Sequence, residues 1–128
     1  MEILLTREPL SLDAACRAVR APGRGGVVLF LGEVRPEEKG KAVSSIEYEA
    51  YESMARKELE RLAAGAERAH GAAVAVHHRL GPVPAGETSV IVAAASAHRA
   101  EAFAACREVI DRLKESAPIW KASFAEAR

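Results

Sequence analysis

Two short apolar runs limit the fold of this chain more than any other feature. Residues 27–31 read Val-Val-Leu-Phe-Leu, and residues 88–95 are also mostly apolar. A run of this length without alternation of polar and apolar residues is typical of a strand that is covered on both faces. The sequence therefore predicts a sheet with other elements packed against both of its faces.

Helical and extended patterns interleave along the rest of the chain. Strands are predicted over residues 3–5, 27–35, 45–51, 73–80, 88–95 and 119–124, and helices over residues 12–20, 53–69 and 99–116. Ser11 and Ser53 are the expected N-caps of the first two helices. The Pro- and Gly-rich residues 36–41 and 81–86 are predicted to be an exposed, mobile loop and a turn.

Several of these strands follow one another directly, which favours antiparallel pairing. The length of 128 residues suits one domain and leaves no room for two ordinary ones. The sequence therefore predicts a single α+β domain over residues 1–128, with a mixed, largely antiparallel sheet and three helices.

Composition excludes several classes of function. Eighteen Lys and Arg residues balance eighteen Asp and Glu residues, which argues against binding nucleic acid or acidic membranes by bulk charge. No apolar run approaches the roughly 20 residues that span a bilayer, and the charged start does not suit a signal peptide, so a cytoplasmic location is expected. Cys16 and Cys106 form no metal-binding motif and are predicted to be buried thiols.

The histidines and arginines have different interpretations. His77 and His78 are neighbours in a predicted strand, so their side chains point to opposite faces and no shared metal site is predicted. His98 and Arg99 begin a predicted helix, where free N–H groups and positive charge favour an anion; a surface capping turn fits equally well. Arg35 ends a predicted strand just before the predicted loop, where it can present its guanidinium at the sheet edge; a surface salt bridge is its simpler interpretation.

Two lysines lie near the C-terminal end of the chain. At about 100° per residue, Lys114 lies about 20° past Phe103, on the shoulder of an apolar stripe formed by Phe103, Cys106, Val109, Ile110, Leu113 and Ala117. A lysine there either extends its charge to solvent or becomes partly desolvated and available for acid–base chemistry. Lys121 follows Trp120 in an extended segment and has no distinguishing spacing.

No Walker A loop or GxSxG motif supports nucleotide binding or serine hydrolysis.

A series of short motifs, spread over nearly the whole chain, is more specific than any single residue. In order, they are FLGEVR at 30–35, EYEAY at 47–51 with Met54-Ala55, HRLG at 78–81, VPAGE at 83–87, HRA at 98–100 with Ala102-Phe103, DRLK at 111–114 and PIWK at 118–121. In this combination the chain resembles the large, catalytic subunit of molybdopterin synthase.

The resemblance implies an α/β-hammerhead-type fold and a central homodimer of large subunits. Each large subunit would bind a small ubiquitin-like sulfur-carrier subunit, giving a heterotetramer. The C-terminal thiocarboxylate of the small subunit would supply sulfur to cyclic pyranopterin monophosphate, forming the dithiolene of molybdopterin. Because the sulfur arrives already activated, the resemblance implies neither a cofactor nor a metal in the large subunit.

The resemblance also implies catalytic and binding roles by position. Lys114 and Lys121 match the two lysines of the pocket that receives the thiocarboxylate tail. Their implied roles are to bind the thiocarboxylate, to stabilise developing negative charge and to move protons. Arg35, His98 and Arg99 match the groups that hold the pterin and its phosphate, a use that suits a rigid guanidinium.

Other matched positions complete the candidate binding site and include two departures. Glu33 and Val34 match residues that flank the substrate through backbone or edge contacts. Ala122 and Ser123 stand where the family usually has a lysine and a glutamate, and family members usually continue beyond Arg128. The alternative function is therefore a non-enzymatic dimeric protein that docks a ubiquitin-like partner or a pterin phosphate. Retention of both pocket lysines argues against this alternative, whereas the shorter tail favours it.

The spacing of two candidate residues predicts how the site is assembled. Arg99 and Lys114 are 15 residues apart on one predicted helix, so their Cα atoms are separated by about 22 Å. A pyranopterin is only about 10 Å long, so one ligand does not reach both residues of one subunit. A two-fold dimer would solve this problem by combining Lys114 and Lys121 of one chain with His98 and Arg99 of the other.

Overall fold

The larger of two sheets confirms the predicted combination of strands and helices. In the computed structural model, which describes residues 1–127, this sheet has the strand order β1-β5-β7-β2. Its strands are β1 (Glu2–Thr6), β5 (Ala73–Arg79), β7 (Thr88–Ser96) and β2 (Gly26–Glu33). β1 runs parallel to β5, and the other two pairs are antiparallel. The fold is therefore α+β with mixed pairing, as predicted.

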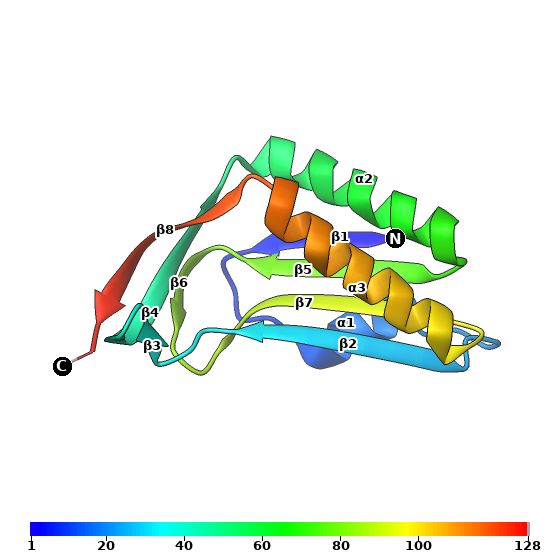
Figure 1. Cartoon of the computed structure of the whole chain (residues 1–128), viewed down its shortest axis with the longest axis horizontal. Helices are drawn as coiled ribbons and strands as arrows, with labels where there is room; N and C mark the ends of the chain where they lie inside the picture. The colour runs from blue at the N-terminus through cyan, green and yellow to red at the C-terminus, as the bar shows by residue number, and fades with distance from the viewer. Residues whose placement is uncertain (128) are drawn as a thin grey trace.

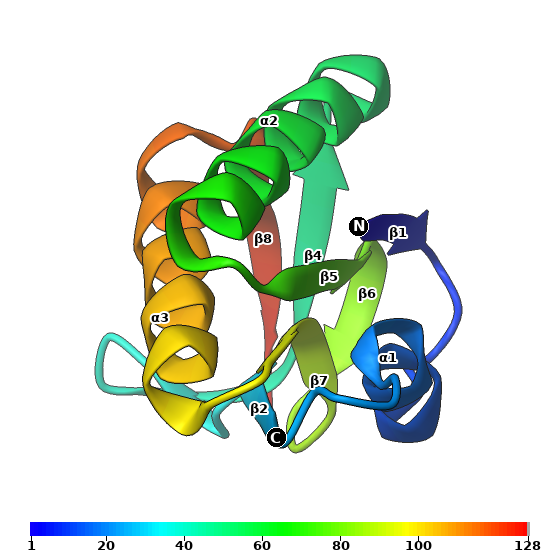
Figure 2. The same cartoon turned by 90° about the vertical axis from the view of Figure 1, so that its right-hand side faces the viewer.

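Three helices cover the two faces of this sheet. They are α1 (Leu12–Val19), α2 (Glu52–His70) and α3 (Arg99–Ser116). Figures 1 and 2 show α2 and α3 side by side on one face, with α1 on the other. Contacts place α2 over β1 and β5, and α3 over β7 and β2. None of the helices in the described residues is long and apolar enough to cross a membrane.

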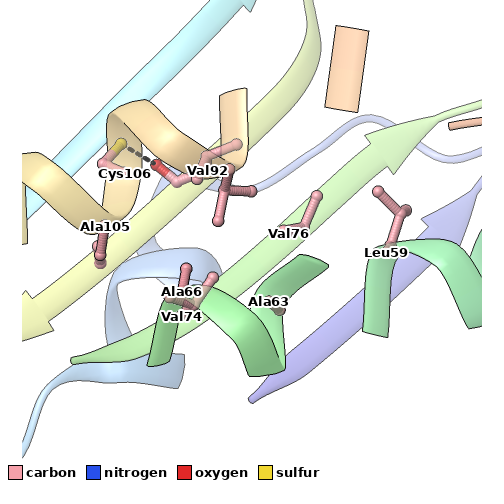
Figure 3. Packing of buried hydrophobic residues seen from close by; sticks show 10 residues of the cluster. Leu59, Ala63, Ala66, Val74, Val76, Val92, Ala105 and Cys106 are labelled. Atoms are coloured by element: carbon pink, nitrogen blue, oxygen red, sulfur yellow. Dashed lines mark hydrogen bonds between the residues drawn. The ribbon is translucent and has the colours of Figure 1, made fainter. Parts of the chain in front are cut away.

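The central strand β7 is buried on both faces, as its continuous apolar run predicts. Val92 and Ala94 pack beneath α2 and α3, in the cluster drawn in Figure 3. Ile91, Ala93 and Ala95 pack with the residues of α1 on the opposite face. The same prediction is only partly right for β2, because β2 is an edge strand and most of its residues are half-buried.

Two of the three predicted helix starts are confirmed. Ser11 caps α1, where its hydroxyl accepts a hydrogen bond from the N–H of Ala14 at 3.1 Å, and α3 has the predicted bounds. The prediction that Ser53 caps α2 is wrong. The N-cap is Tyr51, whose carbonyl accepts the N–H of Ala55 at 2.7 Å. Ser53 therefore lies inside the first turn.

A second, smaller sheet forms around the long strand β4 (Lys41–Ala50). β4 pairs with β3 (Glu37–Glu38), β6 (Gly81–Pro84) and β8 (Ile119–Glu126), all antiparallel. Neither β3 nor β6 was predicted, because both are short and the Gly and Pro residues that usually mark loops lie within β6 and beside β3. The tertiary partner β4 supplies the pairing that holds them extended. The chain therefore forms two sheets, where the sequence predicted one.

The apolar stripe of α3 differs from its prediction in one large residue. Ala102, Ala105, Cys106 and Val109 are buried, but Phe103 is 60% exposed. The buried arc is therefore narrower than the predicted stripe, and Phe103 lies outside it. Cys106 is the predicted buried thiol: it donates to the carbonyl of Val92, and burial raises its pKa to about 11. Cys16, by contrast, is only half-buried.

Candidate functional site

The end of β2 provides the first group of candidate residues. Glu33 is the last residue of β2, and its carboxylate accepts a hydrogen bond from Thr88 Oγ1 at 3.4 Å. Val34 is buried in the core of the smaller sheet, so its side chain does not face a ligand. Its N–H donates to Glu87 at 3.0 Å, and its carbonyl accepts the N–H of Gly86 at 2.8 Å. This anchoring presents Arg35 as an exposed side chain directly after the strand.

Lys121 lies on the smaller sheet, opposite Tyr48 of β4. Directly opposed residues of antiparallel strands share a face, so Lys121 projects from the same face as the half-buried Tyr48. Its Nζ lies 3.5 Å from the carboxylate of Glu38 in β3, and Glu38 is only 16% exposed. Ala122 is the extra residue of a bulge in β8, and Ser123 pairs with Glu47. Both Ala122 and Ser123 are exposed.

Glu38 is a contact residue that the sequence reasoning missed. Residues 36–41 were predicted as a loop, whereas β3 and the start of β4 form a tight hairpin. At its tip, Lys39 has a φ of 53° and Gly40 a φ of 79°, which suits a two-residue hairpin turn. A Lys-Gly pair is a weak signal for such a turn, because asparagine and glycine normally occupy these left-handed positions.

Lys114 lies in the last turn of α3 and is exposed. The chain leaves α3 at Ser116 and enters β8 at Ile119, so Lys114 and Lys121 stand on either side of one short connection. Both lysines therefore belong to the end of the molecule where α3 meets the smaller sheet (Figure 1).

His98 and Arg99 lie at the opposite end of α3. His98 is the N-cap residue, makes no side-chain capping bond and is exposed, as is Arg99. This pair sits beside the start of β2, where a Cβ on Gly26 would lie 2.9 Å from the Cα of Arg99. The close approach requires glycine at this position. The absence of a side chain at Gly26 lets the start of α3 pack directly against the start of β2.

One chain therefore carries two separate groups of candidate residues. Arg35, Lys114 and Lys121 lie toward the smaller sheet, and His98 and Arg99 lie at the far end of α3. Arg99 and Lys114 are on one continuous helix, so about 22 Å separates their Cα atoms. The structure agrees with the predicted separation.

The remaining histidines have structural partners. His77 Nε2 lies 2.7 Å from the carboxylate of Glu2, whereas His78 makes an edge contact with the ring of Tyr48. Burial lowers the pKa of His78, which favours the neutral ring. The two side chains thus have the opposite orientations predicted for strand neighbours. In residues 1–127, no group of three or more His, Cys, Asp or Glu side chains is arranged to hold a metal ion.

Comparison of the sequence with models of protein families identifies the family to which this fold and these motifs belong. The sequence model of the MoaE protein family matches residues 5–116. The chain belongs to the MoaE family. It is 43% identical over 122 residues to molybdopterin synthase catalytic subunit 1 of Mycobacterium tuberculosis, covering 94% of this chain and 83% of that protein.

Solved structures agree with MoaE membership. The chain superposes on molybdopterin synthase from Staphylococcus aureus with a TM-score of 0.89 and 33% identity, covering 98% of this chain and 90% of the other. A chain in a complex of subunits 1 and 2 of the Helicobacter pylori molybdopterin-converting factor has a TM-score of 0.73 and 21% identity, with coverage of 99% and 89%. The second match shows a shared fold. The resemblance read from the short motifs is thereby confirmed: this MoaE chain is a molybdopterin synthase catalytic subunit by family.

Proposed function

We propose that this MoaE chain transfers sulfur from the C-terminal thiocarboxylate of a small ubiquitin-like subunit to cyclic pyranopterin monophosphate, forming the molybdopterin dithiolene. The observation that carries the proposal is the position of Lys114 and Lys121 on either side of the connection between α3 and β8. Two ammonium groups at one end of the molecule supply the positive charge that an anionic thiocarboxylate requires. The name of the Helicobacter pylori complex, with its two subunits, supports a two-subunit assembly.

Each candidate side chain has a defined role in this proposal. Lys114 and Lys121 bind the thiocarboxylate, stabilise the negative charge that develops during transfer and move protons. Arg35, His98 and Arg99 hold the pterin and its phosphate. Lys121 is suited to its role because Glu38 keeps its ammonium on the face shared with Tyr48.

The peripheral positions have lesser roles. Glu33 borders the substrate at the strand edge and Val34 only through its backbone, whose bonds to Glu87 and Gly86 keep this border rigid. Ala122 and Ser123 border the pocket beside Lys121 without adding charge. We propose a homodimer of this chain with one small subunit on each copy, which gives a heterotetramer in the cytoplasm. The proposed chemistry uses no cofactor or metal of this chain.

Reconstitution tests the function directly. The full chain, a thiocarboxylated small subunit and cyclic pyranopterin monophosphate are combined, and dithiolene formation is measured. We expect conversion of the precursor together with loss of the thiocarboxylate. Binding of both partners without any dithiolene would instead show the non-enzymatic binding protein that is the alternative function.

The replacement Lys121→Ala should slow sulfur transfer. A hydrogen bond to a charged group contributes about 1.5–3 kcal/mol, so we expect a decrease of about 10- to 100-fold in the single-turnover rate. Lys41→Ala is the matched control, because Lys41 lies on the same sheet and also pairs with a glutamate, Glu126 at 3.4 Å. Equal rates for the two variants would contradict the role of Lys121.

The replacements Arg35→Ala and Arg99→Ala should weaken binding of the precursor. Each removes a charged donor worth about 1.5–3 kcal/mol, which corresponds to a Kd about 10- to 100-fold higher. Calorimetric titration with cyclic pyranopterin monophosphate measures this change, and titration with the small subunit serves as the control. An equal loss of affinity for the small subunit would contradict the assignment of these arginines to the pterin and phosphate.

A further inference from the structure

Three arginines near the C-terminal end of α1 have no part in the candidate site. Arg17 lies in the last turn of α1, Arg20 is its C-cap residue, and Arg24 lies in the connection from α1 to β2. Residues 14–32 contain these three arginines and no Asp or Glu, although acidic and basic residues balance in the whole chain. Positive charge is therefore concentrated here, on the face of the main sheet opposite α3 (Figure 2).

A tight turn brings Arg24 back to the end of α1. Residues 21–24 read Ala-Pro-Gly-Arg. The N–H of Arg24 donates to the carbonyl of Ala21 at 3.1 Å, and Gly23 has a φ of 87°. Proline at the second position and a left-handed glycine at the third are typical of a type II turn. The Arg24 guanidinium then donates to the carbonyl of Val19 at 2.9 Å. The turn and this bond together hold the side chain at the end of α1.

Structural roles use only part of the hydrogen-bonding capacity of these arginines. Arg17 pairs with Asp13, one turn earlier in α1. Within residues 1–127, neither Arg20 nor Arg24 forms an ion pair. The bond to Val19 uses one of the five N–H donors of Arg24. A cation at the C-terminal end of a helix is favourable, but one guanidinium is enough for that purpose. The donors that remain are available to an anion.

The three arginines line one open pocket. Its volume is about 590 Å³, which lies in the range of small-ligand sites. The lining residues are Arg17, Arg20, Ala21, Pro22, Arg24 and Val27. Val27 lies opposite Ala95 of β7, which packs with the residues of α1, so Val27 projects from the α1 face of the sheet. The pocket therefore combines guanidinium groups with a small apolar surface.

We propose that this pocket binds a diphosphate group, either free or carried by a nucleoside. A guanidinium can donate two parallel N–H bonds to one phosphate. Two guanidiniums without carboxylate partners therefore match two linked phosphates better than a single one. The apolar surface of Pro22 and Val27 gives the organic part of a nucleotide a place to lie. The pocket shares no residue with the candidate pterin site, so this inference does not rest on the proposed function.

Calorimetric titration with inorganic diphosphate tests the site. The full chain carries Arg35→Ala and Arg99→Ala, which removes the arginines of the candidate pterin site. We expect saturable binding of one diphosphate per chain, at least about tenfold tighter than binding of inorganic phosphate. Adding Arg20→Ala should raise the Kd for diphosphate about 10- to 100-fold, because it removes a charged donor. Arg68→Ala is the matched control and should leave the Kd unchanged, since Arg68 is an exposed arginine of α2 outside the pocket.

A conservative variant separates recognition by the guanidinium from simple attraction to positive charge. Arg20→Lys keeps the charge but loses the planar pair of donors. Its Kd for diphosphate should therefore lie between those of Arg20→Ala and the parent protein. Circular dichroism checks that the variants keep the fold, which is expected because Arg20 is exposed.

Titration with ADP identifies the source of the diphosphate group. Tighter binding of ADP than of inorganic diphosphate would show that the nucleoside is bound as well, whereas equal binding would show that the free anion is the ligand. No saturable binding of diphosphate, equal Kd values for Arg20→Ala and Arg68→Ala, or equal Kd values for phosphate and diphosphate would each overturn the inference. Arg20→Ala in the otherwise unaltered chain should leave dithiolene formation unchanged. A failed reconstitution would therefore disprove the proposed function and leave this site unaffected.

Discussion

Replacing Lys114 with alanine should nearly abolish sulfur transfer without disturbing the fold. In the proposed function, Lys114 supplies a positive charge where negative charge develops on the thiocarboxylate and the precursor. Loss of one such preorganised donor typically slows catalysis by about 10²–10³-fold, and we expect this decrease in the single-turnover rate of dithiolene formation. The side chain is exposed in the last turn of α3. Its truncation therefore leaves no cavity, and the unfolding temperature should stay close to that of the wild type.

The control for this prediction is Lys57→Ala. Lys57 is also an exposed lysine on a helix, α2, but has no place in the candidate site. It should transfer sulfur at the wild-type rate. If Lys114→Ala and Lys57→Ala give the same single-turnover rate, Lys114 has no catalytic role and the proposed chemistry must use other groups.

Mixing two impaired variants should restore activity when the precursor concentration is well below the raised Kd of Arg99→Ala, so that each variant alone forms little dithiolene. Lys114→Ala and Arg99→Ala homodimers each lack one group in both of their sites. In the proposed dimer each site takes Lys114 from one chain and Arg99 from the other, so a heterodimer of the two variants has one site that lacks both groups and one that is intact. Statistical exchange makes half of the dimers mixed, which restores about a quarter of the wild-type sites, and purified heterodimers restore about half.

The measurement is the dithiolene yield of the mixture after subunit exchange, with heterodimers verified by differently tagged chains. Each variant incubated alone is the control for residual activity. Verified heterodimers that remain inactive would show that Lys114 and Arg99 act within the same subunit or that one of them is misassigned. The separation of about 22 Å along α3 makes that arrangement incompatible with one bound pterin.

Local sequence patterns were sufficient for the elements that depend on their own residues. The continuous apolar run of residues 88–95 identified the strand β7, and the bounds of α3 follow from its residues alone. The ordered short motifs identified the family, because each keeps its residues contiguous in the chain. These signals are local, so no tertiary information was needed to read them.

Only the tertiary structure decided the features that depend on distant partners. The short strand β6 exists because residues 45–48 of β4 pair with it, and Lys121 meets Glu38 across 83 residues of sequence. The exposure of Phe103 depends on which side of α3 packs against the sheet, which a helical wheel does not contain. Likewise, β2 became an edge strand through the strand order, whereas its apolar run resembles that of a central strand. Sequence alone thus indicated the three helices, the six longer strands and the candidate residues other than Glu38. Packing decided which surfaces are left free and which of those residues share one end of the chain, since these depend on contacts between segments far apart in sequence.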